Sequence, residues 1–302
     1  MRSIFLGSLS AAALLSLSAC GNPSEEPITD TAMDTAQPAE TETTEPVVDY
    51  ADLSTVLAAD WRGAAAERDS WRHPAETLEF FGIDPSSTVV EIWPGGGWYS
   101  DVLAPWISAN GGTYVAAHFP AGSESDYRRR SRANFEARIS DIPAYGEPVI
   151  ADFNAELGLV VEDDSVDAIL TFRNIHNWMA GGTAELAFSE FHAALRPGGV
   201  LGVVEHRLPS TRQQDPMAGS GYVQQDYVIA LAEEAGFEFV EASEINANPA
   251  DTADHPYGVW TLPPTRRSPR DGEDATDFDR AQFDAIGESD RMTLLFRKPA
   301  AE

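Results

Sequence analysis

One stretch of this 302-residue sequence combines an acidic residue with a glycine turn and could bind a ligand. The β-branched run 89–92 carries Glu91, and Trp93 and Pro94 then lead into three consecutive glycines at 95–97. A segment that reads as a helix follows. Glycine lets the backbone approach a ligand, and a new helix offers unpaired N–H groups. A strand that breaks into such a turn is therefore typical of a nucleotide-sized site in an open α/β sheet.

Histidines and a glutamate also stand at the ends of apolar runs. His118, His176, Glu205 and His206 could suggest a metal cluster, because imidazole and carboxylate groups are common metal ligands. The sequence contains no H-x-x-x-H spacing among them, and four separate strand ends would have to converge. We therefore predict no metal site.

The elements that must position these residues alternate along the chain. The apolar patterning predicts strands at 89–93, 114–117, 149–151, 166–172, 200–205, 237–240 and 292–296. It predicts one or two helices within 60–83 and further helices at 98–106, 123–139, 184–195 and 222–235. Near-continuous Val/Ile/Leu strands separated by helices predict an α/β fold with a doubly wound, mostly parallel, seven-stranded sheet.

A long segment separates the last two predicted strands. Residues 246–290 are rich in Pro and Asp and predict an insertion that forms a lid over the site. Its second half, 271–290, is acidic enough to predict a disordered excursion.

Several of these residues resemble a known family, the class I S-adenosylmethionine-dependent methyltransferases, over residues 60–298. Glu91 to Gly97 stands where that family has its first motif, and Leu195 to Leu201 resembles its L-x-P-G-G-x-L element. A last strand hairpinned after the sixth, here 292–296, is also typical. Four motifs look like those of a bacterial subgroup of predicted methyltransferases: Phe80-Phe81-Gly82, Trp93 to Tyr99, Arg173 to Trp178 and Val204 to Arg207.

The resemblance implies S-adenosylmethionine as the cofactor and assigns roles to residues of this chain. The implied cofactor-binding residues are Glu91, Gly95, Gly97, His118, Asp152 and Asn174. The glycines would pass close to the amino-acid part of the cofactor, and Glu91 would reach its amino group through water. Asp152 would hydrogen-bond the adenine amino group, or it could simply cap a turn.

The residues after the fourth predicted strand would line the methyl-transfer site. His176 is implied as a catalytic general base and Asn177 as a catalytic polar positioner, although such a histidine can also be merely hydrogen-bonded. Arg173 could hold an anionic substrate or pair with a carboxylate. Two positions depart from the family. Trp93 replaces the first glycine of the motif, and His118 stands where an acid usually holds both ribose hydroxyls.

Charge and residue usage exclude other classes of function. The formal net charge of −29 argues against a nucleic-acid partner, because phosphates would be repelled. Lys298 is the only lysine, which excludes a P-loop lysine or a lysine Schiff base at the glycine turn. The glycine spacing does not match the G-x-G-x-x-G of dinucleotide-binding oxidoreductases.

The N-terminal residues predict export and lipidation. Arg2 precedes the apolar run 4–17, and Leu17-Ser18-Ala19-Cys20 resembles the lipobox of bacterial lipoproteins, in which the cysteine is lipidated. An ordinary secretory signal with a chance cysteine is the alternative. Gly21 after the cysteine favours, by resemblance, the outer membrane over the inner one.

The sequence predicts three parts in the chain. Residues 1–20 are the lipoprotein signal peptide and lipobox, 21–50 a disordered acidic tether without Lys or Arg, and 51–302 the methyltransferase-like domain. The expected location is the bacterial cell envelope, lipid-anchored to the outer membrane and facing the periplasm. The only membrane contact would be the lipid, and the sequence predicts no oligomeric state.

Two functions follow from these observations. The first is methyl transfer from S-adenosylmethionine to a small-molecule or peptide-borne nucleophile. The second is a non-catalytic, methyltransferase-like envelope lipoprotein that binds another ligand or partner, because S-adenosylmethionine is made in the cytoplasm.

Replacing Cys20 with serine tests the anchor. Serine lacks the thiol that is lipidated, so we expect the Cys20→Ser protein to move from the membrane fraction to the soluble fraction after cell lysis and centrifugation. Ser24→Ala, outside the lipobox, should stay with the membranes. A Cys20→Ser protein that still sediments with membranes would show that the lipoprotein prediction is wrong.

Overall fold

The computed structural model describes residues 48–301. The predicted signal peptide, Cys20 and nearly all of the predicted tether lie outside the described residues. Within 48–301, no helix combines the length and the apolar character that a membrane span requires.

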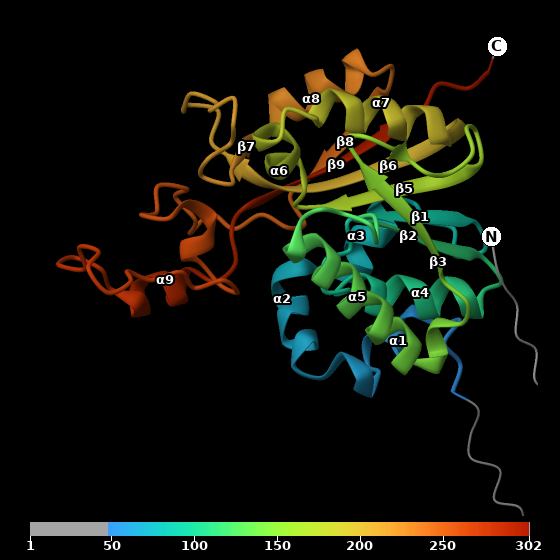
Figure 1. Ribbon diagram of the computed structural model, residues 1–302, viewed down its shortest axis with the longest axis horizontal. Coiled ribbons are helices and arrows are strands. Elements are labelled where there is room, and N and C mark those ends of the chain that lie inside the picture. The colour runs from blue at the N-terminus through green and yellow to red at the C-terminus, as the bar shows by residue number, and fades with distance from the viewer. Residues whose placement is uncertain (1–47, 302) are drawn as a thin grey trace, which may run out of the picture. The chain divides into compact units, whose positions relative to one another are not determined.

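A single sheet runs through the domain (Figure 1). Its parallel strands are β1 (Thr88–Ile92), β2 (Thr113–His118), β3 (Val149–Asn154), β5 (Val166–Phe172) and β6 (Leu195–Leu208). Two antiparallel strands complete one side, β8 (Glu238–Ser243) and β9 (Arg291–Arg297). The strand order is β4-β3-β2-β1-β5-β6-β9-β8, so the chain starts in the middle and winds outward in both directions. This order confirms the predicted doubly wound sheet, including the hairpin between the last two strands.

Within residues 48–301 the sheet has nine strands, where the sequence predicts seven. The two additional strands are β4 (Gly158–Leu159), antiparallel to β3, and β7 (Val223–Gln224), parallel to β6. Each is only two residues long, which is too short to show an alternating pattern in the sequence.

Helices cover both faces of the sheet. Figure 1 shows α6, α7 and α8 on one face and α3, α4 and α5 on the other. The α-helices are α1 (Leu53–Leu57), α2 (Asp69–Arg72), α3 (Pro74–Phe80), α4 (Ser100–Ala109), α5 (Asp126–Asp141), α6 (Ile175–Ala180), α7 (Ala184–Ala194), α8 (Gln225–Glu234) and α9 (Arg280–Ile286). The 3₁₀ helices are η1 (Asp60–Arg68), η2 (Pro143–Tyr145) and η3 (Gly258–Thr261).

Successive residues of a strand pack into two separate hydrophobic cores, one on each face of the sheet. Val90 on β1 belongs to the core that contains Phe191 of α7, whereas its neighbour Val89 packs in the core with Leu103 of α4. This follows from the alternation of side chains along a strand. Because both faces are buried, the strands read as continuous apolar runs.

The insertion between β8 and β9 has defined structure. The sequence predicts a disordered excursion at 271–290, but the structure shows α9 in this segment and buries Glu288 to 2% exposure. The acidic composition misleads because carboxylates here pair with arginines. Asp284 contacts both Arg266 and Arg280, and Glu288 lies among three guanidinium groups.

A glycine before β2 gives a test of this packing. A Cβ at Gly112 would overlap the carbonyl oxygen of Pro85 and lie 2.6 Å from that of Ser87, and backbone cannot yield as a side chain can. We expect Gly112→Ala to lower the free energy of unfolding by roughly 1–3 kcal/mol in urea titrations. Gly122→Ala is the matched control, because its Cβ would meet open space. Equal stability of the two variants would contradict the packing.

Candidate functional site

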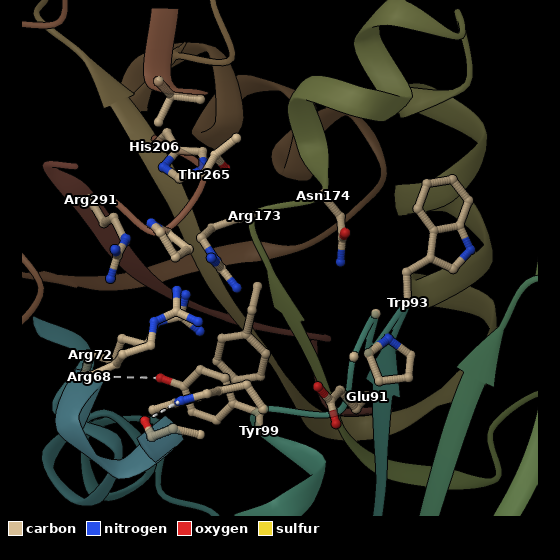
Figure 2. Close-up of a pocket in the computed structure, with 18 of the residues that line it drawn as sticks. Arg68, Arg72, Glu91, Trp93, Tyr99, Arg173, Asn174, His206, Thr265 and Arg291 are labelled. Carbon is tan, nitrogen blue, oxygen red and sulfur yellow. Dashed lines mark hydrogen bonds between the residues drawn. The ribbon is translucent and has the colours of Figure 1, made fainter. Parts of the chain in front are cut away.

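A cavity of about 500 Å³ opens at the carboxyl ends of β1, β5 and β6 (Figure 2). The glycine turn after β1 forms one wall and the residues that follow β5 and β6 form another. The segment before α3 supplies Arg68 and Arg72, and the insertion supplies residues such as Trp260 and Thr265. Open α/β sheets bind ligands at this edge, because the loops that follow parallel strands converge there.

The glycine turn takes its shape from left-handed backbone at three positions. Trp93, Gly95 and Gly97 have φ values of 46°, 60° and 83°. Gly95 lines the cavity, whereas Gly97 is buried and packs against Arg138, whose Cδ would lie 3.3 Å from an added Cβ. Gly97 therefore makes room for helix packing, and Gly95 presents backbone to the cavity.

Glu91 lies at the inner end of the cavity with 2% of its surface exposed. It accepts hydrogen bonds from the Tyr114 hydroxyl at 2.6 Å and the Ser100 hydroxyl at 2.8 Å. Burial raises its pKa to about 7, because desolvation outweighs these two hydrogen bonds. Near neutral pH the Glu91 carboxyl is therefore only partly ionised, and a cationic group in the cavity would favour its ionised form.

Trp93 separates the large cavity from a neighbouring one of about 300 Å³. Its indole N–H donates to the Phe153 carbonyl at 3.1 Å, and its ring centroid lies 4.7 Å from that of Phe119. The second cavity is lined by Trp93, Gly95, Phe119, Tyr127, Arg128, Ser131, Asn174 and Asn177. The two cavities share Trp93, Gly95 and Asn174, so they adjoin at the glycine turn.

Two of the predicted cofactor residues are engaged elsewhere. His118 ends β2 but has no exposed surface, and its Nδ1 accepts the Phe119 N–H at 2.7 Å. Burial and then Arg132 lower its pKa to about 4, so it stays neutral. The Asp152 carboxylate lies 2.9 Å from Nη1 of Arg132. Neither residue lines either of the two adjoining cavities.

Asn174 and Asn177 occupy different positions on the site. The Asn174 amide nitrogen donates to the Ile92 carbonyl at 2.8 Å and to the Thr171 hydroxyl at 3.2 Å, which leaves its oxygen for a ligand. It lines both cavities. Asn177 lines the smaller cavity and not the larger, because consecutive residues of α6 point about 100° apart. The structure thus separates Asn177 from His176.

Three of the four residues weighed as metal ligands converge. His176, Glu205 and His206 offer ligand atoms within 4.8 Å of one another, whereas His118 is not part of this group. His176 Nδ1 lies 3.1 Å from the buried Glu205 carboxylate, and the Ile175 N–H donates to the other carboxylate oxygen at 2.6 Å. An imidazole that donates from Nδ1 to a carboxylate keeps Nε2 as its acceptor, which is the arrangement of a general base.

Of the arginines that line the cavity, the sequence predicts a site role only for Arg173. Arg68, Arg72 and Arg291 line the same cavity, and the buried Glu288 contacts all three. The contacts of Arg68 and Arg72 with Glu288 span 220 and 216 residues. The sequence offers one weak indication of this cluster: arginines are few in this acidic chain, and these stand on or near predicted helices and strands.

Several solved structures are similar to this chain at low sequence identity. A SAM dependent methyltransferase from Aquifex aeolicus is 17% identical, and the match covers 65% of this chain and 93% of that one with a TM-score of 0.48. The [4+2]-cyclase SpnF is 16% identical over 81% and 86% of the two chains, with a TM-score of 0.50. A TehB-like SAM-dependent methyltransferase from Corynebacterium glutamicum is 13% identical over 79% and 94%, with a TM-score of 0.46. No protein-family model and no curated protein matches the sequence. The strand order confirms the predicted doubly wound α/β fold, and the match with the TM-score of 0.50 is similar to this chain in fold.

The raised pKa of Glu91 predicts a pH-dependent stability. Its pKa moves from the ordinary 4.5 to about 7 on folding, so the unfolded chain loses this proton first as the pH rises. The stabilisation is fully present below pH 4.5 and is lost as the pH rises through 7, a change of roughly 3 kcal/mol. Relative to wild type, Glu91→Gln should therefore gain stability between pH 4.5 and 7.5 in urea titrations. Glu156→Gln, at an exposed position, should run parallel to wild type, and a parallel Glu91→Gln profile would contradict the assignment.

Proposed function

We propose that this protein transfers a methyl group from S-adenosylmethionine to a small-molecule nucleophile. The observation that carries the proposal is the position of the glycine turn, which lies between two adjoining cavities at the carboxyl edge of a methyltransferase-like sheet. A ligand with a charged amino-acid end and a flat aromatic end suits such a pair of cavities.

The residues around the turn fit that cofactor. Glu91 and the free oxygen of Asn174 are acceptors for an ammonium group in the larger cavity. Phe119 and Tyr127 offer aromatic surface to a base in the smaller one, in place of the contacts expected from His118 and Asp152. When bound, the cofactor supplies an electrophilic methyl group, and positioning by the protein is the main catalytic requirement.

The larger cavity would hold the methyl acceptor. Its volume of about 500 Å³ is in the range of small-molecule sites. His176 lines it, and Glu205 orients the imidazole so that Nε2 can take a proton from the acceptor. A peptide-borne acceptor would have to enter beneath the insertion residues that wall the cavity.

The second candidate is a protein of this fold that binds a ligand without methyl transfer. The full burial of His118 and the Asp152–Arg132 ion pair favour it, because both remove contacts expected for the adenosine. The neighbour with the TM-score of 0.50 is named a [4+2]-cyclase, so the fold also carries other activities. A lipid-anchored envelope location, which we propose from Cys20, would separate the protein from cytoplasmic S-adenosylmethionine.

Calorimetric titration decides between the two. We expect the chain from Gly21 onward to bind S-adenosylmethionine and S-adenosylhomocysteine with measurable heat. No heat up to about 1 mM ligand, with the fold intact by circular dichroism, would contradict methyl transfer and favour the second candidate.

A substitution in the glycine turn tests the position of the cofactor. Gly96 lines the larger cavity without positive φ, and a Cβ there would meet nothing within 4 Å. We expect Gly96→Leu to fold normally and to bind S-adenosylhomocysteine at least about tenfold more weakly, since the new side chain would occupy the ligand's space. Gly122→Leu makes the same change in an exposed loop and should bind as wild type does. Undiminished binding by Gly96→Leu would place the ligand elsewhere.

A further inference from the structure

Positive charge accumulates in the larger cavity beyond what nearby carboxylates neutralise. Arg68, Arg72, Arg173 and Arg291 all line it. Among the described residues, Glu288 is the one carboxylate that contacts Arg68, Arg72 and Arg291. Its oxygens lie 2.5 Å from Arg68 Nε and 3.0 Å from Arg72 Nε, and it also accepts from Arg291. Four guanidinium groups thus share a single counter-charge.

The remaining acids on the cavity wall do not change this balance. Asp101 is already paired with Arg138, which also lines the cavity. Glu91 has a pKa of about 7 because it is buried, so it carries at most part of a charge near neutral pH. In a chain with 49 acidic and 20 basic residues, a cluster of unneutralised arginines is not the result of a shortage of acids.

Several nitrogens of this cluster have no hydrogen-bond partner among residues 48–301. Arg72 is 2% exposed, yet neither Nη1 nor Nη2 hydrogen-bonds to any residue within 48–301. Arg68 Nη2 and Arg291 Nε are buried and equally unpartnered. The Arg173 side chain makes no hydrogen bond or ion pair with the described residues. Buried donors are normally satisfied, so these groups indicate a ligand that accepts several hydrogen bonds.

The arginines also repel one another. Burial, and then Arg291, lowers the pKa of Arg173 to about 10. Burial, and then Arg173, lowers the pKa of Arg72 well below its usual range. Arg173 is in addition held at φ 65°. A cavity that keeps like charges together at a cost in stability is typical of a binding site.

We propose that the arginine cluster binds the carboxylate or phosphate group of an anionic small molecule, and that this anion is the methyl acceptor. Figure 2 shows the guanidinium groups of Arg72, Arg173 and Arg291 directed toward the same part of the cavity. Planar guanidinium groups bind both anions through paired hydrogen bonds. His176 lines the same cavity and would face the anchored molecule. The role as acceptor rests on the proposed methyl transfer, whereas the anion site itself does not.

Thermal unfolding with simple anions tests the site. The chain from Gly21 onward is heated in chloride buffer at constant ionic strength with increasing sodium phosphate or sodium succinate. Because a ligand that binds the native state stabilises it, we expect Tm to rise and saturate with at least one of the two anions. The anion with the larger rise identifies the group as phosphate or carboxylate. No rise beyond the chloride control with either anion overturns the proposal.

Arg173→Gln distinguishes binding from a structural role. This substitution removes no protein hydrogen bond and relieves repulsion. We expect its ligand-free Tm to equal or exceed that of wild type and its anion affinity to fall at least about tenfold. Arg130→Gln, exposed on α5, is the matched control and should bind as wild type does. Undiminished anion binding by Arg173→Gln, or a lowered ligand-free Tm, overturns the proposal.

A competition experiment separates acceptor from cofactor. We expect phosphate or succinate and S-adenosylhomocysteine to bind together, each without displacing the other in calorimetry. Mutual displacement overturns the assignment to the acceptor, because the arginines would then hold the cofactor's own carboxylate. Anion binding without any S-adenosylhomocysteine binding supports the anion site while the proposed methyl transfer fails.

Discussion

The contact of Glu288 with three arginines holds the two ends of the folded domain together. Arg68 and Arg72 come from the first helical segments, and Arg291 begins the last strand. Arg291 also donates to the Trp71 carbonyl at 3.1 Å. Glu288, Arg72 and Arg291 are almost fully buried, so solvent screens their attraction little. Loss of the carboxylate would leave two buried cations beside the partly exposed Arg68. The same contact joins three of the arginines that line the larger cavity.

Most of the fold follows from local patterning. The strand predicted at 166–172 has those bounds in the structure. Local patterning predicts the long strands because both faces of the sheet are covered, so each of these strands is a continuous apolar run. The two-residue strands β4 and β7 were missed because pairing, not sequence pattern, defines them. The acidic segment at 271–290 was misread because its carboxylates pair with arginines, two of which, Arg68 and Arg72, lie far away in the sequence.

The residues of the site also differ in whether local patterning predicts them. Glu91, Gly95, Asn174 and His176 were found because each follows or ends a recognisable strand, and parallel strands bring such residues to one edge. The arginine cluster could not be found in this way, because Arg68 and Arg72 meet Glu288 across more than two hundred residues. The orientations of His118 and Asp152 depend on Phe119 and Arg132, which sequence position alone does not reveal.

The insertion that walls the cavity begins and ends at the same place. The Arg291 N–H donates to the Asn246 carbonyl at 3.2 Å, and the Asn246 side chain donates to Thr77 and Thr293. The excursion therefore leaves and rejoins the β8–β9 hairpin at a fixed base. For a loop closed at its base, added length costs only a little further entropy. The residues between this base and Glu288 could therefore be exchanged in evolution, and with them the range of molecules admitted, without altering strand register or losing the Glu288 contact.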